Sequence, residues 1–409
     1  MTSSNPGSDT AGTDMAIAAP AMAAADGVAT PEHFERPGFV RLTAADRPGI
    51  AQPVPERDIP SRPWGPILLG ALALFLLLLG AWEAHWRAFG ALPAYRNSDG
   101  SWTSQRRRID HGEGDATVLL GSSRMLSDVQ LDVWERVSGE RPIQLALEGT
   151  PPTVPLEQLA DDPDFTGRLL VDVTASMFRG GDGVRAGAFK RYREEGPSQR
   201  SGHWLSKHLL EPYLAFYDPD FALARVVRRQ AWPQRPGLAP RPTVRKLFVG
   251  AADRNHRLWT KLERDPQYQA LVRANWATLN WDAPLPPPAV QAQWPKQRED
   301  TIRRVATAVA KLRARGVRVV FIRHPIVGPY AAYDRKIAPR ADNWDALLTR
   351  TGAAGVNFED HPELQGYWLP EWSHMAAADA DRYTAALYPI VEREFARTEA
   401  QGMIAASKR

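Results

Sequence analysis

The sequence predicts an α/β protein that has a mostly parallel sheet covered by helices on both faces and is attached to a membrane by one apolar helix. Short apolar strands alternate with amphipathic helices over residues 115–398, which is typical of a parallel sheet. A charge-free stretch of twenty residues precedes this region at 63–82. The 409 residues include no cysteine, which excludes disulfides and thiolate metal sites.

The N-terminal part divides into a polar tail and an apolar segment. Residues 1–62 are rich in Ala, Pro, Ser, Gly and Thr, so they cannot bury enough apolar surface to fold, and we expect a disordered tail. The next segment, 63–82, reads PWGPILLGALALFLLLLGAW, and as a helix it can cross a hydrocarbon core of about 30 Å. Trp64 and Trp82 lie at its two ends, where indoles favour the membrane interface. An interior helix rarely has such an uninterrupted run, and a signal peptide does not follow so long a tail.

The charges that flank this segment predict its orientation. Arg47, Arg57 and Arg62 precede it, whereas Arg87 and Arg96 follow it. Because positive charge favours the cytoplasmic side, we expect a cytoplasmic tail and an extracytoplasmic domain.

Residues 83–114, which contain a run of three arginines, are expected to connect the membrane segment to the domain. Within 115–398, helices are expected at 127–137, 299–315, 343–350 and 376–397, followed by a C-terminal tail at 399–409. Strands are expected at 116–121, 142–149, 168–178, 317–326 and 354–360.

A long insertion, 178–296, separates the third strand from the fourth and is expected to be helical and loop-rich. It contains twenty Lys and Arg but only ten Asp and Glu, a local charge of +10, together with six tryptophans. Such a surface suits an acidic polysaccharide or anionic lipid headgroups, because arginine pairs with carboxylate or phosphate and indoles stack on sugar rings. The alternative is that the tryptophans belong to the core and the arginines are simply solvated.

Three short motifs carry residues suited to acyl-transfer chemistry. Gly121-Ser122-Ser123-Arg124 follows the first strand, where a serine is exposed at the carboxyl edge of the sheet, although serine is also a common helix cap. Gly149 ends the second strand, where a glycine lets a backbone amide approach a reacting carbonyl.

The third motif reads Glu371-Trp372-Ser373-His374 and precedes the last helix. A carboxylate three residues before a histidine can hold one ring nitrogen and direct the other toward a serine as a general base.

In this order the motifs resemble the SGNH (GDSL-like) hydrolase superfamily, which has a serine block near the start of its domain and an acid-x-x-His block near the end. VLLGSSRM, FIRHPIVGPY and PEWSHMAAADADRYTAAL further resemble membrane-anchored SGNH-like proteins of bacterial envelope polysaccharide O-acetylation systems. The resemblance covers 115–178 and 297–398. It implies a flavodoxin-like sheet, an inner-membrane anchor with a periplasmic domain, no cofactor, and a multispanning acyl-transferase partner.

The resemblance also assigns roles to residues. It implies Ser123 as the nucleophile, with Ser122 as the alternative, His374 as the base and Glu371 as the orienting acid. The amides of Ser123 and Gly149 would bind the oxyanion. Arg124 would bind an acidic substrate, or else be a solvated surface arginine.

Two features depart from the family pattern. The acid is a glutamate rather than the commoner aspartate, and VDVTASMF (171–178) lacks the asparagine that often follows the third strand. Losing one oxyanion donor can lower kcat by about 10²–10³.

We therefore expect a membrane-anchored serine enzyme that transfers an acyl group, most simply acetyl, to or from an envelope polysaccharide. A catalytically degenerate scaffold that binds polysaccharide or an assembly partner is one alternative, and a lipid or peptidoglycan esterase is another.

Other polar residues are interpreted as structural. His203 and His208 lack a matching carboxylate for zinc, so no metal site is expected. His324 ends a strand near the expected active edge of the sheet and is expected to have a structural role there. Asp172 and Asp360 end strands but are not assigned to the triad. No phosphate-binding loop or nucleic-acid module is present in the sequence.

Overall fold

The computed structural model describes residues 62–179, 183–229, 244–284 and 286–407. All of the predicted disordered tail except Arg62 lies outside the described residues. The chain divides after Leu77 into two compact units, and this boundary falls within the helix that the apolar segment forms.

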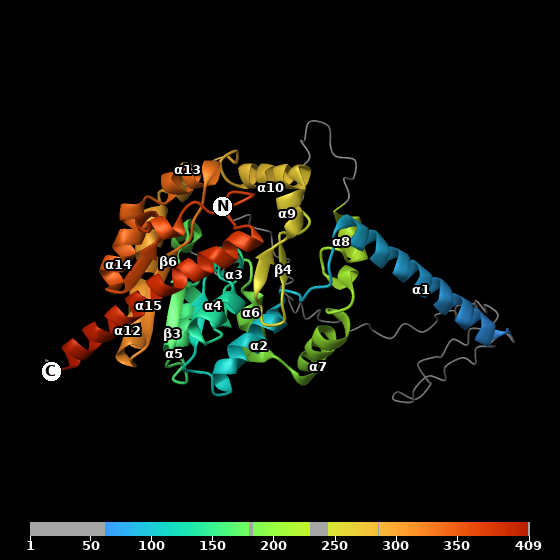
Figure 1. The fold of residues 1–409 in the computed structure, drawn as a ribbon, viewed down its shortest axis with the longest axis horizontal. Helices are drawn as coiled ribbons and strands as arrows, with labels where there is room; N and C mark the ends of the chain where they lie inside the picture. Colours follow the sequence, from blue (N-terminus) through green and yellow to red (C-terminus); the bar gives the residue numbers. More distant parts are fainter. Residues whose placement is uncertain (1–61, 180–182, 230–243, 285, 408–409) are drawn as a thin grey trace, which may run out of the picture. The chain divides into compact units, whose positions relative to one another are not determined.

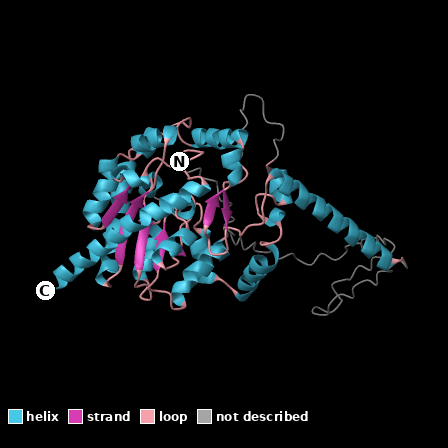
Figure 2. Cartoon of the chain, in the orientation of Figure 1, coloured by secondary structure: helices cyan, strands magenta, loops and turns pink. Residues whose placement is uncertain are grey.

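The main domain is built on a parallel sheet of five strands in the order β2-β1-β3-β6-β7 (Figure 2). The predicted α/β class with a mostly parallel sheet is confirmed. The strands are β1 (Thr117–Leu120), β2 (Ile143–Gln144), β3 (Arg168–Asp172), β6 (Arg318–Arg323) and β7 (Ala354–Asn357). In register, Val118 of β1 pairs with Leu169 of β3, and Leu169 pairs with Val319 of β6.

Helices cover both faces of this sheet because successive strand residues point to opposite sides (Figure 1). Val118, Leu169 and Val319 belong to one core cluster, whereas their neighbours Leu119, Leu170 and Val320 belong to the other. The first cluster packs against α2 (Asp99–Asp110), α5 (Thr153–Asp161), α6 (Gly187–Glu194), α12 (Trp294–Ala314) and α14 (Ala346–Thr351). The second packs against α3 (Ser123–Asp128), α4 (Leu131–Ser138) and α15 (Ala377–Ser407).

Several elements differ from expectation in length. The second strand has only two residues, and the third ends at Asp172. The helix expected at 127–137 is two helices, because the Gln130 amide donates to Thr384 Oγ1 (2.9 Å) and the Leu131 amide to Asn255 Oδ1 (3.0 Å), which starts α4 afresh. The last helix, α15, continues to Ser407 rather than ending at 397, so the expected C-terminal tail is helical as far as it is described.

The apolar segment forms α1 (Trp64–Phe89), which is long and apolar enough to cross a membrane. The segment expected to be a connector, 83–114, is instead folded into the domain. Trp86 and Trp102 are buried, and Trp102 Nε1 donates to the Leu145 carbonyl at 2.9 Å. The three arginines of α2 have carboxylate or aromatic partners within the domain.

The segment expected to be an insertion contains an unpredicted antiparallel hairpin, β4 (Phe248–Gly250) and β5 (His256–Leu258). Its other elements are η1 (Ala175–Arg179, at its start), α6 as given above, α7 (Pro197–Leu205), η2 (Ser206–Leu210), η3 (Ala215–Tyr217), α8 (Leu223–Arg228), α9 (Thr260–Arg264), α10 (Pro266–Leu279) and α11 (Pro288–Gln291). A third core cluster holds η3, α8, α9, α10 and the hairpin to the end of α1, and Trp86, Phe221 and Trp259 are among its members.

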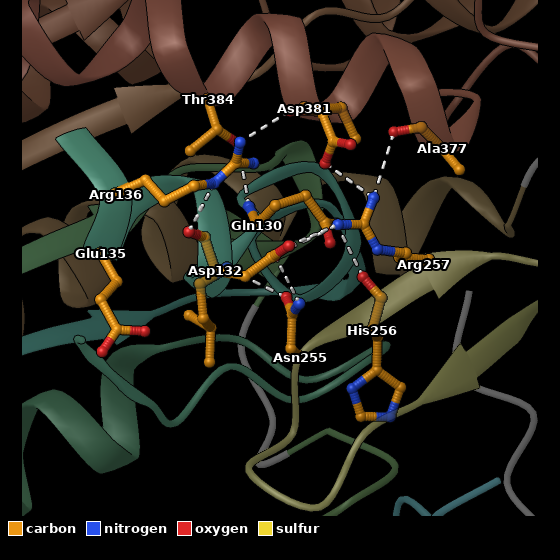
Figure 3. A network of polar contacts seen from close by, with 12 residues as sticks. Gln130, Asp132, Glu135, Arg136, Asn255, His256, Arg257, Ala377, Asp381 and Thr384 are labelled. Carbon is orange, nitrogen blue, oxygen red and sulfur yellow. Dashed lines mark hydrogen bonds and ion pairs between the residues drawn. The ribbon is translucent and has the colours of Figure 1, made fainter.

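Polar contacts attach the hairpin to the helices of the main domain (Figure 3). Arg257 of β5 pairs with Asp132 of α4 at 3.0 Å and with Asp381 of α15 at 2.7 Å. Gln130 Nε2 donates to the His256 carbonyl at 2.8 Å. The hairpin is therefore fixed beside the helix that begins just after the predicted histidine motif.

The remaining described elements follow β6 and β7. They are α13 (Gly328–Ile337), η4 (Ala341–Asp345), η5 (Phe358–Asp360) and η6 (Pro362–Leu364).

Candidate active site

Ser123 is the first residue of α3 and lies at the carboxyl edge of the sheet, directly beyond β1. Gly121 makes the turn between them with φ of +156°. A Cβ at this position would lie 2.4 Å from Asp172 Cβ, so only glycine lets β1 pass so close to the end of β3. The turn leaves Ser123 partly exposed, whereas Ser122 is buried.

Ser123, His374 and Glu371 lie in hydrogen-bond contact with one another. Ser123 Oγ is 2.8 Å from His374 Nε2, and His374 Nδ1 is 2.8 Å from Glu371 Oε1. Because the carboxylate can only accept, Nδ1 carries the ring proton and Nε2 is left to accept from the serine hydroxyl. His374 and Glu371 are almost fully buried.

The two serines have different partners. Ser122 Oγ donates to Asp172 Oδ2 at 2.6 Å, and the Ser122 amide donates to the same oxygen at 3.1 Å. Asp172 thus ties the serine turn to the end of β3. This contact directs the Ser122 hydroxyl away from His374, so Ser123 is the serine that meets the histidine.

Glu371 accepts three hydrogen bonds that fix its carboxylate. The His374 backbone N–H donates to Oε1 at 2.6 Å in addition to the ring contact. Oε2 accepts from the indole N–H of Trp276, which belongs to α10. The turn between acid and base is closed by Trp372, a non-glycine residue in the left-handed region with φ of +73°.

Side chains from 178–296 also cover the histidine ring. Phe248 of β4 meets His374 edge to face, with ring centroids 4.8 Å apart, and the Trp276 ring lies 6.2 Å away. Arg273 Nε donates to the Pro370 carbonyl at 2.9 Å, immediately before the acid. This part of the chain therefore completes the site rather than standing apart from it.

Asp128, at the end of α3, is a second buried carboxyl group near His374. Its Oδ1 accepts from the Met375 amide at 3.1 Å and from Ser127 Oγ at 2.9 Å, which ties the histidine turn to the serine helix. Burial raises the pKa of Asp128 to about 7, although the nearby His374 opposes this shift. Asp128 therefore positions the histidine turn, and its burial makes it easier to protonate than an ordinary aspartate.

The two amides expected to bind an oxyanion lie at the same edge of the sheet. Leu147 lies two residues before Gly149, and its amide donates to the Gly121 carbonyl at 2.9 Å. This bond holds the chain that leads to Gly149 beside the serine turn. Gly149 has φ of +60°. Within the described ranges, neither the Ser123 nor the Gly149 amide donates to another group.

Arg124 is buried, so the alternative of a solvated surface arginine is wrong. Its Nε donates to Ser373 Oγ at 3.3 Å, and its guanidinium lies 5.1 Å from the Tyr330 ring centre. Burial lowers the pKa of Arg124, but Tyr330 and Asp334 more than offset this and raise it above its ordinary value. The arginine therefore keeps its charge inside the protein.

A small cavity lies beside Arg124, beyond the ends of β3 and β6, with room for about one water-sized group. Thr174 and His324 also line it. His324 Nδ1 contacts Tyr383 Oη at 2.9 Å, whereas its buried Nε2 has no partner among the described residues. Burial lowers the pKa of His324 to about 4, so this ring is neutral.

The other polar residues singled out in the sequence lie apart from the triad. Asp360 forms a two-pronged ion pair with Arg340 on the surface. The exposed His208 stacks on Trp204 with ring centroids 4.7 Å apart. Over the described part of the chain, no group of three or more His, Asp or Glu residues could hold a metal ion.

The sequence motifs singled out Ser123, His374 and Glu371, which lie together in the structure. They did not indicate the residues that hold these three side chains in place. Trp276 and Phe248 are far from the histidine motif in sequence, and nothing in their local pattern differs from that of core aromatics. Tryptophans of 178–296 differ in their surroundings: Trp259 is buried, Trp276 donates to Glu371 and Trp204 is exposed, whereas Trp232 lies outside the described residues. Searches against protein families and curated proteins found no match for the chain.

We expect Trp276→Phe to slow the reaction of Ser123 with a fluorophosphonate probe by about tenfold. The substitution keeps the ring but removes the N–H donated to Glu371, and a hydrogen bond to a charged group contributes about 1.5–3 kcal/mol. The measurement is the labelling rate of the purified full chain in detergent. Trp281→Phe is the matched control, because Trp281 packs on Trp372 without a hydrogen bond to the triad. Equal rates for the two variants would exclude the orienting role of Trp276.

Proposed function

We propose that this protein is a membrane-anchored serine enzyme that transfers an acyl group, most simply acetyl, through Ser123. The observation that carries the proposal is the continuous contact from Ser123 Oγ through the His374 ring to Glu371, with both distances at 2.8 Å. A nucleophile, a base and an orienting acid in this arrangement suit acyl transfer.

In the first half of the reaction, Ser123 Oγ attacks the carbonyl carbon of the donor ester while His374 Nε2 takes the hydroxyl proton. The carbonyl oxygen becomes negatively charged and would be bound by the Ser123 and Gly149 amides. When this intermediate collapses, the ester C–O bond breaks and the leaving alcohol takes the proton from His374. The acyl group then remains on Ser123.

In the second half, a hydroxyl group of a sugar or of water gives its proton to His374 and attacks the acyl carbon. The bond to Ser123 Oγ breaks and the serine recovers its proton from His374. Glu371 stabilises the imidazolium at both stages through its bond to Nδ1. The chemistry needs no cofactor.

The proposed acceptor is an acidic envelope polysaccharide. Arg124 supports this choice, because it directly follows the nucleophile in the sequence and its charged guanidinium can pair with a carboxylate. The motif resemblance to envelope O-acetylation proteins further suggests a multispanning acyl-transferase that supplies the acyl group.

A catalytically degenerate scaffold is the second candidate. It is favoured by the residues after β3, where Thr174, Ala175 and Ser176 stand in place of an oxyanion asparagine. Such a protein would hold a polysaccharide or an assembly partner without forming an acyl-enzyme. A lipid or peptidoglycan esterase would use the same triad, with water as the acceptor.

Ser123→Ala and His374→Ala should each abolish esterase activity toward a small acetyl ester, and the double variant should be no worse than either alone. Residues that act as one unit show such non-additive losses. Glu371→Gln should retain more activity, because an amide oxygen can still accept from His374 Nδ1. Ser122→Ala is the matched control for the serine turn and should keep substantial activity. A His374→Ala variant with normal turnover would eliminate this mechanism.

We further propose that α1 spans a bacterial inner membrane with residues 1–62 in the cytoplasm and 83–409 in the periplasm. The arginines before the span favour this orientation, and Arg87 after it is paired with Glu83 at 2.6 Å. Alkaline phosphatase fused to the C-terminus should be active in cells, whereas a fused fluorescent protein that folds only in the cytoplasm should stay dark. The reverse pair of results would invert the topology.

A further inference from the structure

Exposed apolar side chains are concentrated in one short stretch of the domain. Outside α1, thirteen large apolar side chains of the described residues are exposed, and six of them lie between residues 204 and 227. Single exposed apolar residues need no explanation, but a group of them marks an interaction surface. The six are 45–64% exposed, and they are Trp204, Leu205, Leu209, Tyr213, Leu223 and Val227.

Their spacing aligns them on helix faces. Leu205 and Leu209 are four residues apart across α7 and η2, and Leu223 and Val227 are four apart on α8. Side chains at this spacing share one side of a helix. An adjoining side of α8 is anchored, because Val226 belongs to the buried cluster around Trp86 and Phe221. Each helix therefore turns an apolar stripe away from the core.

Both stripes adjoin the end of α1 within the same compact unit. Trp82 Nε1 donates to the Phe221 carbonyl at 3.2 Å, two residues before Leu223. Arg87 Nη2 donates to the Tyr213 carbonyl at 2.9 Å. Glu83 binds the chain between these points by accepting from the Ala215 and Phe216 amides, each at 2.9 Å.

Trp82 also ends the charge-free apolar segment, where the membrane–water boundary is expected. The elements that contact Trp82 and Arg87 must therefore lie at that boundary. Trp204 and Tyr213 are the residue types enriched there, and the exposed Arg228 can reach anionic headgroups.

We propose that these six side chains form a membrane-contact surface that holds the domain against the bilayer in which α1 is anchored. The occupant is lipid rather than polysaccharide, because the surface is apolar and continuous with the end of the membrane segment. The contact gives the domain a fixed orientation, which a flexible tether would not give. This inference rests on the proposed membrane insertion of α1 but not on the chemistry of Ser123.

The absence of native cysteine allows a direct test on the full chain. Single cysteines replace Leu209, Leu223 or Val227, carry a nitroxide label, and are reconstituted in vesicles of phosphatidylcholine with anionic phosphatidylglycerol. Collision with oxygen, which concentrates in lipid, is compared with collision with a water-soluble nickel chelate. Leu72 within the apolar part of α1 is the lipid control, and the exposed Val137 of α4 is the aqueous control.

The three labels should show oxygen-to-nickel collision ratios well above that of Val137 and close to that of Leu72. Ratios equal to that of Val137, with Leu72 in lipid, would overturn the membrane-contact surface while leaving the anchor intact. Low collision with both reagents would also overturn it, because it would indicate a protein partner such as a second copy. A Leu72 label in water would remove the anchor on which the inference rests. None of these outcomes bears on the Ser123 chemistry, which the activity assay tests separately.

Discussion

The arrangement of the candidate site depends on the carboxylate of Glu371. It is fully buried, and its two oxygens accept from the His374 ring, the His374 backbone and the Trp276 indole. A buried carboxylate is stable only when such donors satisfy it. The same bonds fix the tautomer of His374 and thereby direct Nε2 to Ser123. The left-handed turn at Trp372 and the tie from Asp128 to Met375 hold the peptide that carries both residues.

The sheet supplies the other half of the site through an equally strict constraint. Parallel strands end at one edge, so the turn after β1, the chain after β2 and the end of β3 meet there. Gly121 lets β1 and β3 approach within a distance that no side chain would allow, and Asp172 then binds Ser122. Because of this contact, the Ser122 hydroxyl is bound to Asp172, whereas the Ser123 hydroxyl is left to contact His374. A sequence pattern alone left that choice open.

Much of this architecture could be predicted from sequence because its signals are local. The apolar strands β1, β3 and β6 are continuous hydrophobic runs, and the acid and histidine are only three residues apart. The supports of the site could not be predicted, because they depend on contacts between distant segments. Trp276 meets Glu371 from 95 residues away, and Phe248 belongs to a three-residue strand too short to detect. Likewise, α2 looked like a connector because its burial comes from Trp102 and from arginines with partners elsewhere in the domain.

The segment 178–296 contacts both the candidate site and the last turns of α1. Through β4 and α10 it packs on His374 and donates a hydrogen bond to Glu371. Through η3 and the chain that leads into α8 it forms hydrogen bonds with the last turns of α1. The motif resemblance does not cover residues 178–296, and these contacts give that segment a structural role.

The most direct test of the account is to trap the acyl-enzyme. The full chain in detergent is mixed with p-nitrophenyl acetate, quenched in acid within the first turnover, and digested for mass spectrometry. The account predicts acetyl on the Ser123 hydroxyl in the unmodified chain and in Ser122→Ala, and none on this residue in His374→Ala. Acetyl on Ser122 instead, or acetylation of Ser123 that is unaffected by loss of His374, would contradict the central claim.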